Sequence, residues 1–230
     1  MKIYYRLSPN SAGVGKEKIK NATKQYCLQN TVNVFGKNNI TVIGDNLNEE
    51  LQIFVEQLDI RYIPVSFGNG SGTFRYAVDL AIKENNDDEI VYLLEDDFLH
   101  LPESPMLIKE AIKSMDTYVT LYDHPDKYID GDKGGNPQIQ DGGEVTKLVM
   151  TKSSHWKLTN STVMSWAVQV KRLKKDYDFH MKYSQKRVTE SYGLFTELRN
   201  NGVGVISSVP GRSTHCETKW LSPLVDWENI

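Results

Sequence analysis

Short apolar segments alternate with amphipathic helical segments over the first 95 residues, and this alternation constrains the fold more than any other feature of the chain. The predicted strands cover residues 2–7, 40–45, 60–67 and 89–95. The helices predicted between them cover about residues 16–30, 48–58 and 72–84. Apolar strands separated by helices of this length predict a parallel sheet covered on both faces, and therefore an α/β fold.

The second half of the chain has a different pattern. Residues 122–143 are rich in Gly, Asp and Pro and are predicted to form a long loop. Residues 144–159 and 161–170 have the pattern of strands in a mixed or antiparallel sheet. A helix is predicted over 190–202 and a last strand over 203–208. The tail after this strand carries two of the four tryptophans, so we expect it to pack against the domain.

The composition excludes several classes of protein. Of the 230 residues, 39% are hydrophobic and 25% are charged, and the net charge is −3, which is typical of a soluble domain without a broad basic surface for nucleic acid. No window reaches the length of a membrane span, and the first residues lack the apolar stretch of a signal peptide. Cys27 and Cys216 form no CxxC pair and suit a reducing compartment. We therefore predict a cytoplasmic protein.

Three adjacent carboxylates, Glu95, Asp96 and Asp97, end the fourth predicted strand, and no basic residue lies near them in the sequence. In an open parallel sheet, ligands bind at the carboxyl ends of the strands. Three acids there repel one another unless a cation compensates them, and Mg²⁺ or Mn²⁺ binds through one or two carboxylates together with phosphate oxygens. The alternative is a solvated acidic turn before a helix that starts near Ser104.

Residues 60–97 resemble the donor-binding half of GT-A-type glycosyltransferases, particularly the large family-two-like group. In that family a strand leads to an Asn/Gly-rich turn, an Arg near the start of a helix and a strand that ends in the Asp-x-Asp (DXD) motif. Here the turn is 68–72, the Arg is Arg75 and the acidic motif begins at Glu95. Asp45 ends the second strand, at the position where the family's Asp often contacts the nucleoside.

The resemblance continues downstream and covers about residues 2–100 and 160–217. The segment 189–206 is similar to the family's Glu-Asp-containing helix, with Glu190 at the first acid and Ser191 in place of the second. His215 follows the last strand, where many members of the fold supply a third ligand to the metal or pyrophosphate.

The resemblance implies a GT-A-like, Rossmann-type sheet that is mostly parallel and flanked by helices, with a smaller mixed or antiparallel sheet on the acceptor side. It implies one glycosyltransferase domain over 1–230, with the nucleotide-sugar-binding half in about 1–100 and the acceptor half and tail in about 101–230. The implied reaction is metal-dependent, inverting transfer of a hexosyl or deoxyhexosyl group from a UDP- or GDP-type nucleotide sugar. The implied acceptor is a glycan or a lipid-linked or protein-linked sugar, either soluble or at a membrane surface.

Roles for individual residues follow from the same resemblance. Mn²⁺ or Mg²⁺ would be held by Asp97, His215 and Glu95. The nucleotide sugar would be bound by Arg6, Asp45, Arg75, Glu95 and Asp96. Glu190 would take the proton of the acceptor hydroxyl.

Each of these residues also has a purely structural alternative. Glu190 suits the start of a helix capped by Thr189, and Asp45 suits the cap of the next helix. Arg75 can pair with an Asp one turn later, and His215 can be a packed histidine.

Two further groups of residues allow either a binding or a structural interpretation. Asp123, His124 and Asp126 could form a second metal cluster or part of a sugar-contacting loop. His155, Trp156 and Trp166 could stack on an acceptor sugar or pack in the core. The segment 13–18 is excluded as a phosphate loop, because Asn10 and Glu17 replace required residues.

Two other functions remain open. A sugar-1-phosphate nucleotidyltransferase also has a parallel sheet and metal-binding acids, but its Gly-rich loop after the first strand is not matched here. A non-catalytic carbohydrate-binding protein of the same fold is the other alternative, against which the acidic motif, His215 and Glu190 argue together.

Overall fold

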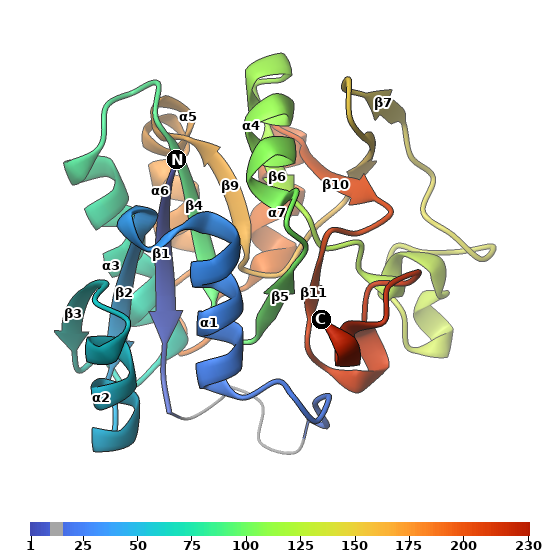
Figure 1. Ribbon diagram of the computed structural model, residues 1–230. Coiled ribbons are helices and arrows are strands. Elements are labelled where there is room, and N and C mark those ends of the chain that lie inside the picture. The colour runs from blue at the N-terminus through green and yellow to red at the C-terminus, as the bar shows by residue number, and fades with distance from the viewer. Residues whose placement is uncertain (10–15) are drawn as a thin grey trace.

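The computed structural model describes residues 1–9 and 16–230. Residues 13–15 of the rejected phosphate-loop segment therefore lie outside the described residues. One large sheet contains nine of the described strands in the order β3-β2-β1-β4-β9-β6-β10-β8-β7 (Figure 1). The bounds of these strands are β1 (Lys2–Leu7), β2 (Ile40–Asp45), β3 (Arg61–Val65), β4 (Ile90–Glu95), β6 (Tyr118–Thr120), β7 (Leu148–Met150), β8 (His155–Thr159), β9 (Trp166–Gln169) and β10 (Val205–Val209).

The first four strands of this sheet are parallel, as the alternation of strands and helices predicts. β9 is antiparallel to both of its neighbours, β4 and β6, so β6 runs in the same direction as β4. β10 is parallel to β6, and β8 and β7 complete the sheet as antiparallel strands. A separate two-stranded antiparallel sheet joins β5 (Phe98–His100) to β11 (Ser213–His215).

Helices cover both faces of the large sheet (Figure 1). Their bounds are α1 (Lys24–Phe35), α2 (Glu49–Gln57), α3 (Gly70–Glu84), α4 (Ser104–Ser114), α5 (Val170–Lys175), α6 (Tyr177–Lys182) and α7 (Ser191–Asn200). The apolar side chains of α1, α2 and α4 form one core with one face of the sheet, and those of α3, α5 and α7 form a second core with the other face.

The continuous apolar sequence of the central strands follows from this arrangement. In β4, Tyr92 and Leu94 belong to the first core, whereas Val91 and Leu93 belong to the second. Because successive side chains of a strand point to opposite faces, a strand covered on both faces must be apolar at every position.

The helix that the sequence predicts over about 16–30 is shifted. Thr23 caps the N-terminus of α1 by accepting a hydrogen bond from the backbone N–H of Tyr26. The residues before this cap form a β-bridge instead, between Lys18 and Glu217. The prediction was wrong here because the partner of this segment lies about 200 residues away in the sequence.

The tail after β11 packs against the domain, as expected from its tryptophans. Trp227 is buried and forms a small apolar cluster with Ile19, Cys27, Leu99 and Cys216. Both cysteines are free thiols. Within the part of the chain that the structure describes, no helix combines the length and the apolar character needed to cross a membrane.

Candidate active site

The carboxyl ends of the parallel strands lie at one edge of the sheet and carry most of the predicted site residues. Arg6 of β1 is in register with Glu95 of β4, and Asp45 ends β2 beside them. Asp123 follows the end of β6, which runs in the same direction as β4. The sheet therefore brings these four charged residues to the same edge.

Basic side chains from distant parts of the sequence neutralise the first two acids of the motif. The Arg6 guanidinium lies 3.1 Å from Glu95 Oε1. Lys24 forms an ion pair with Asp96, and the backbone N–H of Ser8 donates to Asp96 Oδ2 at 2.8 Å. The repulsion expected among adjacent acids is thus relieved by bases that only the fold brings near.

The third acid, Asp97, contacts two basic groups through one carboxylate oxygen. His215 Nε2 lies 3.0 Å from Asp97 Oδ2, and Lys18 Nζ lies 2.8 Å from the same oxygen. The other oxygen, Oδ1, is buried and accepts no hydrogen bond among the described residues. The structure therefore brings together Asp97 and His215, which are 118 positions apart in the sequence. We call Glu95, Asp96, Asp97 and His215 the acidic site.

Backbone hydrogen bonds hold the three segments of this contact together. The backbone N–H of Cys216 donates to the carbonyl of Asp97 at 2.9 Å, and that of Ile19 donates to the carbonyl of Cys216 at 3.1 Å. The β-bridge between Lys18 and Glu217 continues this pairing. The backbone of Lys18 is thus held in place by main-chain pairing, independently of the ion pair of its side chain.

Burial and charge act in opposite directions on the acidic site. Burial alone raises the pKa of Asp97, but His215 and Lys18 outweigh it and hold the pKa of this carboxyl below its usual range. Burial raises the pKa of Glu95 despite Arg6, and it raises that of Asp96 despite its lysine partner. Burial lowers the pKa of His215, but Asp97 outweighs it, so the net shift is upward. Asp97 is therefore the acid most firmly held in the ionised form.

The acidic site offers two protein ligands for a divalent cation. Two ligands at adjacent corners of an octahedral Mg²⁺ or Mn²⁺ shell lie about 3 Å apart, because each is about 2.1 Å from the ion. The 3.0 Å separation of His215 Nε2 and Asp97 Oδ2 fits this geometry, and the unpaired Asp97 Oδ1 is a further acceptor. Among the described residues, no group of three His, Cys, Asp or Glu side chains is arranged to hold a metal. A cation here would therefore take most of its ligands from a bound phosphate and water.

Asp45 holds the turn that precedes α3. It is buried, and its Oδ1 accepts hydrogen bonds from the Gly68 backbone N–H at 3.1 Å and the Asn46 amide at 2.9 Å. Gly68 has a φ of 65°, which favours glycine at this position. The alternative role of Asp45 as a helix cap is wrong, because Asn48 caps α2 by accepting from Leu51.

The two arginines of the predicted donor site are anchored by backbone carbonyls. Arg6 donates to the carbonyls of Gly70 at 3.3 Å and Met164 at 3.1 Å, which places the start of α3 beside β1. Arg75 donates to the carbonyl of Ser184, in the segment between α6 and α7. The alternative partner of Arg75, Asp79, accepts a hydrogen bond from the Tyr177 hydroxyl.

Glu190 lies at the N-cap position of α7, where its side chain makes no capping hydrogen bond. It is half-exposed and pairs with Lys186 at 2.8 Å. The neighbouring Thr189 hydroxyl lies 3.2 Å from that of Ser71, in the first turn of α3. Thr189 therefore packs against the start of α3, where the carbonyl of Gly70 accepts a hydrogen bond from Arg6, whereas the Glu190 side chain pairs with Lys186.

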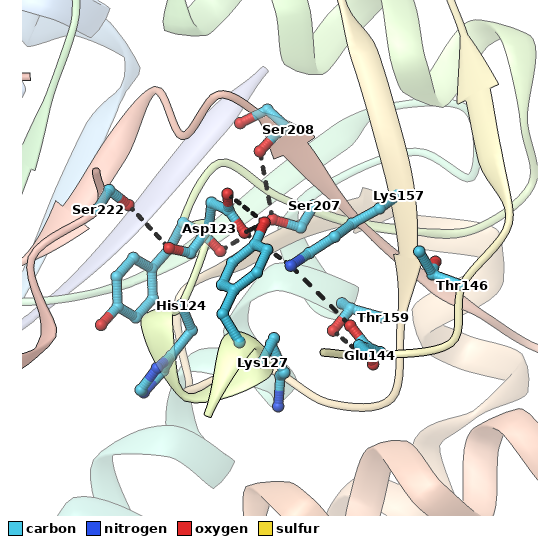
Figure 2. Close-up of polar contacts among 12 residues, drawn as sticks. Asp123, His124, Lys127, Glu144, Thr146, Lys157, Thr159, Ser207, Ser208 and Ser222 are labelled. Atoms are coloured by element: carbon cyan, nitrogen blue, oxygen red, sulfur yellow. Dashed lines mark hydrogen bonds and ion pairs between the residues drawn. The ribbon is translucent and has the colours of Figure 1, made fainter. Parts of the chain in front are cut away.

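A second set of charged residues lies beyond the end of β6, and we call it the buried cluster; its members are Asp123, Glu144 and Lys157 (Figure 2). The half-exposed Tyr128 lies beside it. Lys157 Nζ lies 2.8 Å from Asp123 Oδ1 and 4.0 Å from Glu144 Oε2. The Tyr128 hydroxyl donates to Asp123 Oδ2 at 2.8 Å, and Lys157 Nζ lies 4.0 Å from the centre of the Tyr128 ring. This set is an internal network of charges and hydrogen bonds.

His124 and Asp126 lie beside this cluster. With Asp123, the sequence indicates for them either a second metal cluster or part of a sugar-contacting loop. His124 Nδ1 lies 3.0 Å from Asp126 Oδ1, and Lys127 Nζ lies 3.4 Å from the same oxygen. The carboxylate of Asp126 thus has a lysine partner, and no three His, Cys, Asp or Glu side chains among the described residues of this loop are arranged to hold a metal.

The tryptophans interpreted as acceptor contacts, Trp156 and Trp166, are fully buried, so core packing is their role. A different set of aromatic rings leads away from His215. Phe98 contacts His215 and Tyr122, with ring centres 5.2 and 5.6 Å apart. The row continues through His124 to the partly exposed Trp220, at 4.8 and 5.3 Å. No periodic pattern in the sequence predicts this row, because its members come from distant parts of the chain, near residues 98, 122–124 and 215–220.

Comparison with known proteins identifies the fold. No family model and no curated protein matches the sequence. A structure of GalNAc-T7 with UDP, GalNAc and Mn²⁺ superposes with a TM-score of 0.58 at 9% identity, over 93% of this chain and 43% of that chain. A structure of CMP:2-keto-3-deoxy-manno-octonic acid synthetase complexed with CTP superposes with a TM-score of 0.51 at 13% identity, over 91% of each chain. This chain thus spans less than half the length of GalNAc-T7. The likeness confirms the predicted GT-A-like α/β fold.

Proposed function

We propose that this chain is a metal-dependent glycosyltransferase that moves a hexosyl or deoxyhexosyl group from a nucleotide-diphosphate sugar to a hydroxyl acceptor with inversion. The observation that carries the proposal is the 3.0 Å contact between Asp97 and His215 at the carboxyl end of β4. The fold that the chain shares with a protein holding UDP, GalNAc and Mn²⁺ supports it.

Mn²⁺ or Mg²⁺ would be held by Asp97 and His215, with Glu95 as a third ligand if it leaves Arg6. His215 would bind through Nε2 after this nitrogen releases its proton to water, because a histidine ligand is neutral. A cation in this place would neutralise the negative charge that develops on the leaving diphosphate. The fit rests on the spacing of the first two ligands and on the buried acceptor Asp97 Oδ1, which has no hydrogen-bond partner among the described residues.

The donor-binding role is assigned to residues around the start of α3. Asp45 fixes the backbone of the turn at Gly68, and Arg6 fixes both this turn and Glu95. Arg75 lies one turn into the helix and presents a planar guanidinium suited to a diphosphate or to sugar hydroxyls. Asp96 completes the charge balance at the acidic site through its lysine partner.

Glu190 is proposed as the base that accepts the proton of the attacking hydroxyl. Its carboxylate is accessible, and an exposed ion pair such as that with Lys186 is worth about 1 kcal/mol or less. The exchange of Lys186 for an acceptor hydroxyl therefore costs little. The proposed acceptor is a glycan or a lipid-linked or protein-linked sugar on the cytoplasmic side.

A sugar-phosphate nucleotidyltransferase is the second candidate, and one specific observation favours it. Lys16, Lys18 and Lys24, which follow β1, all reach acids near its carboxyl end. The fold is also shared with a CMP-sugar synthetase complexed with CTP. Such an enzyme would join a nucleotide to a sugar acid or sugar phosphate and release pyrophosphate.

Product analysis separates these functions. The protein is incubated with UDP- and GDP-sugars, and in parallel with CTP or UTP plus sugar acids or sugar phosphates, each with and without Mn²⁺. Release of nucleoside diphosphate that requires Mn²⁺ is the expected result, and Asp97→Asn should lower its rate at least about 100-fold. Release of pyrophosphate would establish the second candidate, and release of neither product would leave a binding protein.

A further inference from the structure

The Lys18 ammonium is paired with the Asp97 oxygen that a bound metal would need as a ligand. Its Nζ lies 2.8 Å from Asp97 Oδ2, the same oxygen that His215 approaches at 3.0 Å. A lysine ammonium and a divalent cation cannot both lie against this oxygen without strong repulsion, because both are positive. A cation that binds here must therefore displace Lys18.

The contact is built into the fold. The backbone of Lys18 pairs with Glu217, and the next residue, Ile19, donates to Cys216, the neighbour of His215. The segment that presents the lysine is thus anchored to the segment that presents the histidine. The Lys18 side chain is only 20% exposed, compared with 53% for Lys16, so it lies inside the site and not on the open surface.

The displaced ammonium has a natural second partner. A nucleotide diphosphate that completes the shell of the cation brings negative oxygens to within a few ångströms of Asp97. The long, flexible side chain of lysine can move from a carboxylate to a phosphate while its backbone stays paired. Charge therefore stays balanced in both states, with the lysine on the acid before binding and on the phosphate afterwards.

We propose that Lys18 is an exchangeable counter-ion, which holds Asp97 before the metal binds and pairs with the diphosphate once the metal has displaced it. This inference rests on the proposed function for the identity of the diphosphate. If the exchange occurs, Lys18 is a nucleotide-binding residue, a role that nothing near it in the sequence indicates. It also predicts that Lys18 opposes binding of the metal alone but favours binding of the metal with nucleotide.

Two binding measurements test these opposite effects. Binding of Mn²⁺ alone is followed by loss of the electron paramagnetic resonance signal of free aqueous Mn²⁺, in wild-type protein and in Lys18→Met. The variant should bind Mn²⁺ about tenfold more tightly. With Mn²⁺ at saturation, the same variant should bind the better of UDP and GDP about tenfold more weakly, because a charge-assisted hydrogen bond to phosphate is lost.

Lys24→Met is the matched control, because it removes one positive charge from the neighbouring acid and leaves the partners of Asp97 in place. Equal changes in the two lysine variants would overturn the proposal, since they would reflect only the general field of the site. Weaker Mn²⁺ binding in Lys18→Met, or unchanged nucleotide affinity, would also overturn it. Lys18→Gln repeats the test if the Met variant is unstable.

Asp97→Asn checks that the measured cation lies at this site. It should abolish the gain in Mn²⁺ affinity when it is combined with Lys18→Met, and a retained gain would place the cation elsewhere and overturn the proposal. Neither binding measurement requires a sugar or turnover. A failure to transfer glycosyl groups is therefore distinguishable from a failure of the exchange.

Discussion

Two sets of acid–lysine pairs lie at the same edge of the sheet, and they differ in exposure and not in distance. In the acidic site, Lys18 lies 2.8 Å from Asp97, and the two side chains are 20% and 14% exposed. In the buried cluster, Lys157 also lies 2.8 Å from Asp123, but the two side chains are only 5% and 3% exposed. Distance alone therefore does not tell an exchangeable ion pair from a permanent one.

The hydrogen bonds around each acid explain the difference. The Tyr128 hydroxyl lies 2.9 and 2.8 Å from the two carboxylate oxygens of Asp123, which share its one hydrogen. Lys157 lies against one of these oxygens and over the tyrosine ring. Figure 2 shows Lys157 pointing toward Asp123. Asp97, in contrast, uses one oxygen for two bases and leaves the other without a hydrogen bond among the described residues. Among the described residues, Glu144 Oε2 and Lys157 Nζ of the buried cluster also form no hydrogen bond, so the contrast concerns the two aspartates. Asp123 has partners at both oxygens, whereas Asp97 has a free acceptor for the proposed ligand.

The largest effect is expected from breaking the pair in the buried cluster. Lys157→Met leaves the Asp123 carboxylate buried without its cation, which should lower the free energy of unfolding by about 3–5 kcal/mol. Urea denaturation measures this change. The exposed Lys147 on the neighbouring segment provides the control, and Lys147→Met should change stability by less than about 0.5 kcal/mol. A loss below about 1 kcal/mol for Lys157→Met would remove the distinction between the two sets.

Acid denaturation also tests the comparison between the acidic site and the buried cluster. The contribution of the two fully buried histidines must first be separated from that of the carboxylates. Burial lowers the pKa of both His100 and His180 to about 3. The unfolded chain protonates each of them near pH 6.5, so the stability that they contribute is complete above that pH and is lost as the pH falls toward 3. As the pH falls from 5.5 to 4, each of these two histidines should therefore lower the free energy of unfolding by about 1.4 kcal/mol per pH unit.

Urea titrations at several pH values test this expectation. Relative to the wild type, His100→Gln should show a slope that is smaller by the contribution of one histidine. His215 has a raised pKa, so its contribution is complete below pH 6.5 and adds no slope in this range. An unchanged slope in His100→Gln would show that the carboxylates of the two sets cause the acid response.

The sheet could be predicted from the sequence because the apolar patterns of its strands and helices are local. β4 is apolar at every position before Glu95, and β1 is apolar except at Lys2 and Arg6. The helices between these strands have one apolar face, so each element can be recognised within about 15 residues. Asp97 could be placed at a strand end for the same reason. His215 needed the resemblance to the glycosyltransferase family, because nothing near it in sequence indicates a partner 118 positions earlier.

The bases of the acidic site could not be predicted in this way. Lys18 and Lys24 lie 79 and 72 positions from their acids, and a lysine in a polar segment is normally solvated. The pattern around Lys18 predicts a helix, although its backbone pairs with Glu217. Contacts of this kind depend on how the chain returns to the sheet edge, and single-sequence patterns carry no information about that path.

A smaller loss of stability is expected in the acidic site. Lys18→Met leaves Asp97 with His215 as its remaining partner and with access to water, so the free energy of unfolding should fall by only about 1 kcal/mol. Urea denaturation in parallel with Lys157→Met gives the comparison directly. Equal losses in the two variants would mean that the Lys18 pair is structural, like the pair in the buried cluster.

The smallest effect on stability is expected at Glu190, which extends the comparison to a pair that is exposed on both sides. Its side chain is 50% exposed and that of Lys186 is 72% exposed, so Glu190→Gln should change the free energy of unfolding by less than about 0.5 kcal/mol. If Glu190 is the base, kcat should nevertheless fall by about 100-fold to 10,000-fold. Glu197→Gln, on the same helix and paired with Lys182 at 2.7 Å, is the matched control and should leave kcat unchanged. A similar kcat for the two variants would assign the base to another residue, because loss of the Glu190 carboxylate would then matter no more than loss of the Glu197 carboxylate.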